Sequence, residues 1–241
     1  MIKLNLQHVK ESLMVTIPYI TLIINTSIVT KVFPKPGKHS IIIPIHKSGD
    51  IEEPTNFRPI NLLPILSKIL EKVMTTQLTE YLENSNLLNE SQYAYCNNSS
   101  TEQALVNVTE EIYKSIDKGK ISLLVLLDLS KVFDRVNHDL LLNKLVQLNI
   151  DSTWFANYLH DRTHSVKIDK ITSEAQSNLY GVPQGSILDP ILFNIFINDI
   201  PKINSLPEIT TSTTIYADDI QLLFSGSPNN LEQLKYMQRQ A

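Results

Sequence analysis

An uninterrupted apolar run, Leu123–Leu127, ends in an acidic residue, Asp128. The run is too short for a typical helix and contains no polar residue, so it predicts a buried strand in the centre of a sheet. Asp128 then stands at the carboxyl end of this strand. Taken alone, Asp128 could equally cap a following helix.

A second feature is a predicted hairpin near the C-terminal end of the sequence. Two strand-like runs, Thr211–Ile215 and Ile220–Phe224, are joined by Tyr216-Ala217-Asp218-Asp219. If this hairpin shares a sheet with Leu123–Leu127, the three aspartates meet at one edge. Carboxylates so close repel one another, and bound divalent cations such as Mg²⁺ stabilise them. Two such ions promote in-line phosphoryl displacement. An Asp-Asp pair at a hairpin tip is also ordinary turn chemistry.

The remaining pattern alternates short strands with amphipathic helices. Short strands are predicted at Ile41–Ile45 and from Phe57, and a hairpin at 165–180. Helices are predicted at 66–82, 102–116, 137–148 and 188–196, with a loop at 84–100. This order predicts an α+β fold in which a mixed or antiparallel sheet is backed by helices.

The N-terminal 30 residues predict one helix, bent near Pro18. No charged residue occurs from Ser12 to Thr30, which raises the alternative of a membrane segment. Several polar residues interrupt the segment, and it barely reaches spanning length. We therefore expect a buried helix and no membrane partner.

Composition limits the possible classes of protein. A chain of 241 residues with 42% hydrophobic residues can bury a core of its own. The single cysteine, Cys96, excludes an internal disulfide framework and a zinc site of paired cysteines, so we expect an intracellular protein, cytoplasmic or nuclear. A net charge of −4 argues against a strongly basic nucleic-acid binder. Residues 1–72 nevertheless hold nine Lys and Arg against five acids, so this part could contact phosphates.

Five segments occur in an order that is typical of one enzyme family. They are Ile43–Asp50, Phe57–Leu63, Leu127–His138, Gly181–Leu188 and Tyr216–Asp219. Together they resemble the reverse transcriptase of non-LTR (LINE-type) retrotransposons. The motif Ser-Lys-x-Phe-Asp-x-Val-Asn-His around Phe133 resembles the corresponding motif of LINE elements in particular. The resemblance implies the fingers and palm of a right-hand polymerase, with an antiparallel palm sheet, over 31–241, preceded by a helical extension over 1–30.

The resemblance also implies roles for individual residues. Asp128 and Asp218 would be the principal ligands of two Mg²⁺ ions, with Mn²⁺ as a substitute, and Asp219 would support them. Phe133 would exclude the 2′-hydroxyl of a ribonucleotide. The residues expected at the incoming nucleotide are Lys47, Arg58, Gln184 and Gly185. Seen alone, Phe133 is more typical of a core aromatic and Lys47 of a solvated loop.

The implied reaction is RNA-templated DNA synthesis from a DNA primer and deoxynucleoside triphosphates. The sequence departs from the family pattern at Val132, where alanine is common, at Asp189, where glycine is common, and at Tyr93–Cys96. We also expect the thumb and an endonuclease domain to be missing. The alternative is a catalytically inactive relic or a nucleic-acid-binding remnant. The oligomeric state is left open.

Overall fold

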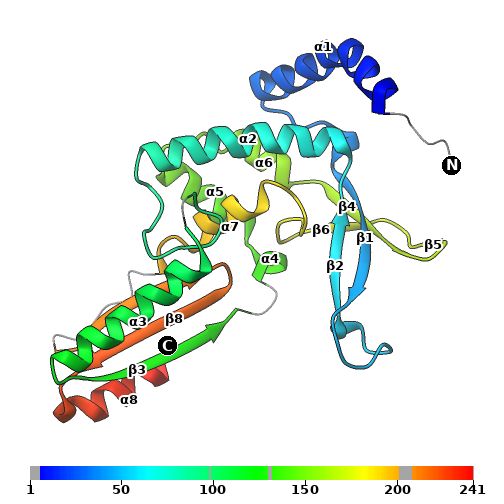
Figure 1. Ribbon diagram of the computed structural model, residues 1–241. Coiled ribbons are helices and arrows are strands. Elements are labelled where there is room, and N and C mark those ends of the chain that lie inside the picture. The colour runs from blue at the N-terminus through cyan, green and yellow to red at the C-terminus, as the bar shows by residue number, and fades with distance from the viewer. Residues whose placement is uncertain (1–5, 98, 130–131, 201–207, 241) are drawn as a thin grey trace. The chain divides into compact units, whose positions relative to one another are not determined.

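The structure is a computed structural model that describes residues 6–97, 99–129, 132–200 and 208–240. The chain forms two compact units (Figure 1). The first unit comprises Met1–Thr76 and Asn137–Leu188, and the second comprises Gln77–Val136 and Asp189–Ala241. Helix α2 (Ile65–Asn84) belongs to both. Each unit has its own sheet, so the two are described in turn.

The first unit contains a mixed sheet. Strand β1 (His39–His46) pairs with β2 (Phe57–Leu62) in antiparallel and with β4 (Arg162–Ile168) in parallel orientation. The short strands β5 (Ile171–Thr172) and β6 (Gln176–Asn178) both pair with β4. The predicted strands near Ile41 and Phe57 and the predicted hairpin at 165–180 are thereby confirmed.

The helices of the first unit are α1 (Leu6–Thr30), part of α2, α5 (His138–Gln147) and α6 (Thr153–Leu159). Two short 3₁₀ helices, Lys35–Gly37 and Pro54–Asn56, lie in its loops. Asn137 caps α5 as the sequence predicted, because its side chain accepts the N–H of Leu140 at 3.0 Å. Helix α5 therefore begins at the residue that its local sequence signal indicates.

Helix α1 confirms one expectation and corrects another. It runs through Pro18 without interruption and ends where Lys31 adopts a φ of 59° and the Val32 N–H donates to the Ser27 carbonyl at 3.1 Å. The prediction that it is buried is wrong, since only 6% of Leu13–Thr30 is buried. Its described contacts are few, such as the Trp154 indole N–H that donates to Ser27 Oγ. By length and composition alone, this segment could cross a membrane, as could many core helices and signal segments.

The second unit contains a three-stranded antiparallel sheet in the order β3 (Ile121–Asp128), β8 (Asp219–Gly226), β7 (Thr210–Tyr216). Helices α3 (Thr101–Asp117) and α8 (Leu231–Gln240) contact the strands and lie on either side of them in Figure 1. The unit also includes α4 (Val132–Arg135), α7 (Asp189–Ile197) and the 3₁₀ turn Pro228–Asn230. This is the helix-backed antiparallel sheet that the sequence predicted.

The apolar run that ends in Asp128 does not form the central strand. Strand β8 occupies the centre, with Leu222 and Phe224 almost completely buried, whereas β3 lies at the edge. Alternate residues of β3 are exposed, and Leu126 keeps 67% of its surface accessible. Central strands and edge strands can both consist of apolar residues, so an apolar run in the sequence cannot distinguish between them.

Candidate active site

The register of the sheet aligns two of the predicted acidic residues. Asp128, the last residue of β3, lies directly opposite Asp219, the first residue of β8, and Asp219 lies opposite Tyr216 at the end of β7. Directly opposed residues project to the same face of a sheet with Cβ atoms about 4.5–5.5 Å apart. Asp218 occupies the adjoining turn, where its carbonyl accepts the N–H of Leu129 at 3.3 Å. The three acidic residues therefore gather at one end of the sheet.

The turn that carries Asp218 is tight and braced from behind. Ala217 adopts a φ of 55°, a left-handed conformation that costs a non-glycine residue about 1–2 kcal/mol. The side-chain carbonyl of Gln92 accepts the N–H of Ala94 at 2.8 Å and that of Ala217 at 3.4 Å. The neighbouring N–H of Tyr93 donates to the Ile215 carbonyl at 2.9 Å. The loop at residues 91–94 thus holds the hairpin in place.

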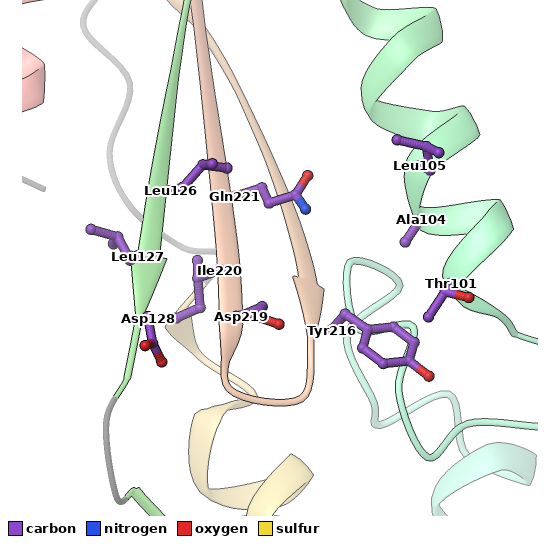
Figure 2. Close-up of a pocket in the computed structure, with 10 residues that line it drawn as sticks. All are labelled: Thr101, Ala104, Leu105, Leu126, Leu127, Asp128, Tyr216, Asp219, Ile220 and Gln221. Carbon is purple, nitrogen blue, oxygen red and sulfur yellow. The ribbon is translucent and has the colours of Figure 1, made fainter. Parts of the chain in front are cut away.

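A cavity of about 330 Å³ opens beside the acidic residues (Figure 2). Its walls come from β3, from the β7–β8 hairpin and from α3, and include Leu105 and Leu126. In Figure 2 the carboxyl groups of Asp128 and Asp219 lie at the hairpin end of this cavity. Both residues are exposed and Asp218 is half-buried, so solvent and ions have access to the carboxylates.

The donor set fits hard divalent cations. Asp128, Asp218 and Asp219 offer only oxygen ligands, which suits Mg²⁺ or Mn²⁺. None of the three forms an ion pair within the described ranges, so their charges are not neutralised by a nearby cationic side chain there. Among the described residues, no group of three His, Cys, Asp or Glu side chains is close enough to hold an ion. The carboxylates are neighbours, but they do not form a preassembled cage.

Tyr95 lies near this site, although no motif in the sequence indicated a role for it. Burial raises the pKa of its hydroxyl, and the nearby charges of Asp218 and Tyr216 raise it further. The residue is 51% exposed and has a φ of 58°. The sequence marked Tyr93–Cys96 only as a departure from the family pattern. Its tyrosine hydroxyl brings a hydrogen-bond donor near Asp218.

Phe133 lies in the same unit as the acidic residues, on α4. Its ring is half-buried, and its centroid is 4.5 Å from that of Phe193, a fully buried residue of α7. This contact anchors one side of the Phe133 ring by aromatic packing. The role of Phe133 in sugar selection remains a prediction.

The two predicted cationic residues lie on the β1–β2 hairpin of the first unit. Arg58 is opposite Ile45, and the N–H of Lys47 donates to the Asn56 carbonyl at 2.8 Å, which extends the ladder by one step. Strand alternation therefore directs Lys47 and Arg58 to the same face of the hairpin. Both are exposed, and neither forms an ion pair in the described part of the chain. They are available to an anionic ligand.

Gln184 and Gly185 lie in a loop that is docked on β2. The Gln184 carbonyl accepts the backbone N–H of Asn61 at 3.0 Å and its side-chain N–H at 3.2 Å. Gly185 has a φ of 103°, and a Cβ atom there would lie 3.1 Å from the Asn61 carbonyl oxygen. Glycine is needed at this position because of both the conformation and the close approach. The loop is thus tied to the strand that carries Arg58.

The sequence matches known proteins over most of its length. The profile of the family described as reverse transcriptase (RNA-dependent DNA polymerase) matches residues 45–241. A probable RNA-directed DNA polymerase from transposon BS of Drosophila melanogaster is 34% identical over 87% of this chain and 24% of its own length. The RNA-directed DNA polymerase from mobile element jockey of the same species is 30% identical over 85% of this chain and 23% of its own. The chain thus spans about a quarter of the length of these relatives.

Solved structures of similar fold come from telomerases. Apo telomerase from Candida tropicalis, truncated from its C-terminal domain, superposes with a TM-score of 0.57 at 14% identity, over 85% of this chain and 47% of that chain. The telomerase of Candida albicans in complex with a fragment of telomeric RNA gives a TM-score of 0.55 at 16% identity, over 88% and 43%. Similarity at this level shows a shared polymerase fold. The chain therefore belongs to the reverse transcriptase family, and the relatives named above are RNA-directed DNA polymerases of mobile elements.

Proposed function

We propose that this chain carries the nucleotidyl-transfer site of an RNA-directed DNA polymerase. The observation that carries the proposal is the register of β3 with β8, which aligns Asp128 with Asp219 and leaves Asp218 in the adjoining turn. The reaction joins a deoxynucleotide to the 3′-hydroxyl of a DNA primer, directed by an RNA template, and releases pyrophosphate. Such a reaction needs positioned carboxylates at an open surface, and the exposed cavity beside Asp128 supports that requirement.

Asp128 and Asp218 are the proposed principal metal ligands, and Asp219 supports or shares them. Two Mg²⁺ or Mn²⁺ ions bound there would activate the primer hydroxyl and stabilise charge on the leaving oxygen. The residues themselves contribute anionic oxygens from a rigid sheet end. Because Asp128 and Asp219 come from paired strands, the ladder fixes the spacing of their backbones.

The first unit would supply the contacts to the triphosphate. Lys47 offers a compact charge and Arg58 a fork of donors, and both suit phosphate oxygens. Gln184 and Gly185 would line the nucleotide pocket, where the absence of a side chain lets the backbone approach the substrate. Phe133 would lie beneath the sugar. These roles extend the family resemblance to the matching residues of this chain.

We further propose that the reverse transcriptase domain covers 31–241 and that 1–30 form an extension. The end of α1 at Thr30 and the family match from residue 45 support a boundary in this region. The RNA template, the DNA primer and the deoxynucleoside triphosphates are the proposed partners.

Metal binding tests the proposal separately from turnover. Mn²⁺ titration of the purified chain, followed by the loss of the free-ion paramagnetic resonance signal, should detect bound ions. Asp128→Asn and Asp218→Asn should each weaken this binding by about tenfold or more, since each removes an anionic ligand. If neither substitution changes Mn²⁺ affinity, while RNA binds the two variants and the parent chain alike, the chain is a nucleic-acid-binding remnant and the proposal fails.

A further inference from the structure

Two side chains of opposite charge are buried in the core of the first unit. Glu71 on α2 has no exposed surface, and Arg162, at the start of β4, keeps only 3%. Neither forms an ion pair within the ranges that the structure describes. Burial of a charge without compensation is strongly unfavourable. Other groups in this core must therefore offset the two charges.

Tyr158 of α6 connects the two charged groups. The guanidinium carbon of Arg162 lies 4.6 Å from the centre of the Tyr158 ring, and Arg162 Nη1 donates to the Tyr158 carbonyl at 3.1 Å. The Tyr158 hydroxyl donates to Glu71 Oε1 at 3.1 Å. A cation over the ring face withdraws electron density, which strengthens the hydroxyl as a donor to the carboxylate. The tyrosine thus contacts the cation through its ring and the anion through its hydroxyl.

The Glu71 carboxylate is also the end point of hydrogen bonds from the Gly181–Leu188 loop. Its Oε2 accepts the backbone N–H of Ile187 at 3.0 Å. Ser186 Oγ lies 2.9 Å from the Tyr158 hydroxyl and accepts the N–H of Leu188 at 3.0 Å. Because the Tyr158 proton is directed to Glu71, Ser186 donates to Tyr158. The Tyr158 hydroxyl and the Ile187 N–H therefore both donate to the same carboxylate.

The same loop is held from a second direction. Thr75, also on α2, donates its hydroxyl to the Ile187 carbonyl at 3.3 Å. Asn61 binds the Gln184 carbonyl through two N–H groups, and its own side-chain oxygen accepts the Ser40 hydroxyl at 2.7 Å. Anchors thus hold Gln184 itself and the residues that follow Gly185. The backbone of this segment is determined by buried groups that lie outside it.

We propose that Glu71, Tyr158 and Arg162 are positioning residues that hold the Gly181–Leu188 loop in the form that receives the incoming nucleotide. This inference rests on the proposed function of Gln184 and Gly185. None of the three needs to touch the nucleotide, since each acts through the loop backbone. Glu71 is the decisive member because both the Tyr158 hydroxyl and the Ile187 N–H end on it.

Tyr158→Phe tests the network with the smallest change. It keeps the ring against Arg162 and removes the hydroxyl, so Glu71 loses one donor and Ser186 loses its acceptor. Amide hydrogen exchange at Ile187 and Leu188 should become about tenfold faster, as expected when a buried hydrogen-bond network is broken. The amides of the β1–β2 ladder should exchange as before. The dissociation constant of dTTP with Mg²⁺ should rise by about threefold to tenfold.

The matched control is Tyr113→Phe, the same change at a tyrosine of α3 that is 63% exposed, which should leave both measurements unaltered. Glu71→Gln provides a second variant that preserves size but removes the charge, and it should loosen the loop in the same way. Unchanged exchange at Ile187 and Leu188 in both variants would overturn the inference, and so would a looser loop with unaltered dTTP affinity. If the parent chain binds no dTTP, the proposed function fails, and the exchange comparison alone decides whether this network holds the loop.

Discussion

The hairpins β7–β8 and β1–β2 are both antiparallel, but they present charge in different ways. In β7–β8, the last paired residues, Tyr216 and Asp219, are joined by a two-residue turn, and β8 is buried almost to the tip. In β1–β2, a longer connection with a 3₁₀ turn at Pro54–Asn56 separates the strands, and the residues beyond Ile45 are exposed as far as Thr55. The first hairpin carries Asp218 and Asp219 near its tip, whereas the second carries Lys47 and Arg58, with three acidic residues in its connection.

The difference indicates how each kind of group is positioned. The acidic residues take their place from strand register, and a shift of one residue would move Asp219 to the opposite face. Lys47 and Arg58 are long, flexible side chains on an exposed hairpin, which can adjust to a phosphate without precise backbone placement. We therefore expect substitutions of the acidic residues to affect chemistry, and substitutions of the cations to affect substrate affinity.

The largest effect should come from Asp128→Asn. Loss of one anionic ligand should lower deoxynucleotide incorporation by about 100-fold or more, since the proposed metal site depends on it. Its melting temperature should stay unchanged, because Asp128 is exposed and has no ion pair in the described ranges. Asp169→Asn is the matched control, an exposed aspartate in the β4–β5 turn. An Asp128→Asn variant as active as this control would contradict the site assignment.

A smaller effect, of a different kind, is expected for Arg58→Ala and Lys47→Ala. Each should raise the KM for dTTP by about tenfold, because one charge-assisted contact to phosphate is lost, while kcat falls less. Steady-state kinetics at saturating template would measure the two constants. Lys170→Ala, at an exposed lysine of the same unit, should change neither. A fall in kcat with no change in KM would contradict the expectation that the cations of β1–β2 act on substrate affinity and the acidic residues of β7–β8 on chemistry.

Phe133→Ala should alter selectivity more than rate. Removal of the ring should allow ribonucleotides to compete with deoxynucleotides, and the ratio of their kcat/KM values measures this change. The lost contact with Phe193 should also lower stability by about 1–2 kcal/mol, less than for a fully buried phenylalanine. Phe196→Ala, at another half-buried phenylalanine of this unit, should lose stability without a change in sugar discrimination. If both variants discriminate between ribonucleotides and deoxynucleotides to the same extent, Phe133 acts only as a core residue.

The left-handed conformation of Ala217 in the β7–β8 turn allows a test for backbone strain. Ala217→Gly should raise the free energy of unfolding by up to about 1 kcal/mol, because glycine adopts a φ of 55° without steric cost. Urea denaturation would measure the difference. Ala104→Gly in α3 should instead lose about 1 kcal/mol, as is usual within a helix. A loss of stability in Ala217→Gly would mean that the left-handed turn is not strained.

The smallest effect concerns an ion pair outside both hairpins. The Lys31 ammonium, followed by the Thr153 N–H, holds the pKa of Asp151 well below its usual value. A carboxylate with a lowered folded pKa stabilises the fold above its unfolded pKa of about 4, and this contribution disappears as the pH falls further. The melting temperatures of the parent chain and Asp151→Asn should therefore differ slightly at neutral pH and converge in acid. A constant difference at all pH values would exclude the ion pair as its cause.

Much of this fold was predictable because local signals and tertiary structure agree. The Asn137 cap, the hairpin around Asp218 and the strand that ends at Asp128 depend on residues close in sequence, and each formed as expected. The sequence also indicated that Asp128 would meet the hairpin at one edge if both belonged to the same sheet. Only pairing with β8 determines the actual register, and no property of either segment alone specifies it.

The errors share one physical origin. The sequence can show that Leu13–Thr30 and Leu123–Leu127 are apolar, but it cannot show what covers them. Helix α1 is largely exposed, and β3 lies at the edge of its sheet. Tyr95 and Glu71 went unnoticed for the same reason, because their significance depends on neighbours that are distant along the chain.

Primer extension tests the central claim most directly. The purified chain, with Mn²⁺ or Mg²⁺, would be given dTTP and an oligo-dT primer on a poly-rA template, beside Asp218→Asn and the Asp169→Asn control. We predict template-dependent extension by the parent chain and by the control, with no extension by Asp218→Asn although its melting temperature is unchanged. Absence of extension by the folded parent chain, or extension that persists in Asp218→Asn, would contradict the assignment of polymerase chemistry to these acidic residues.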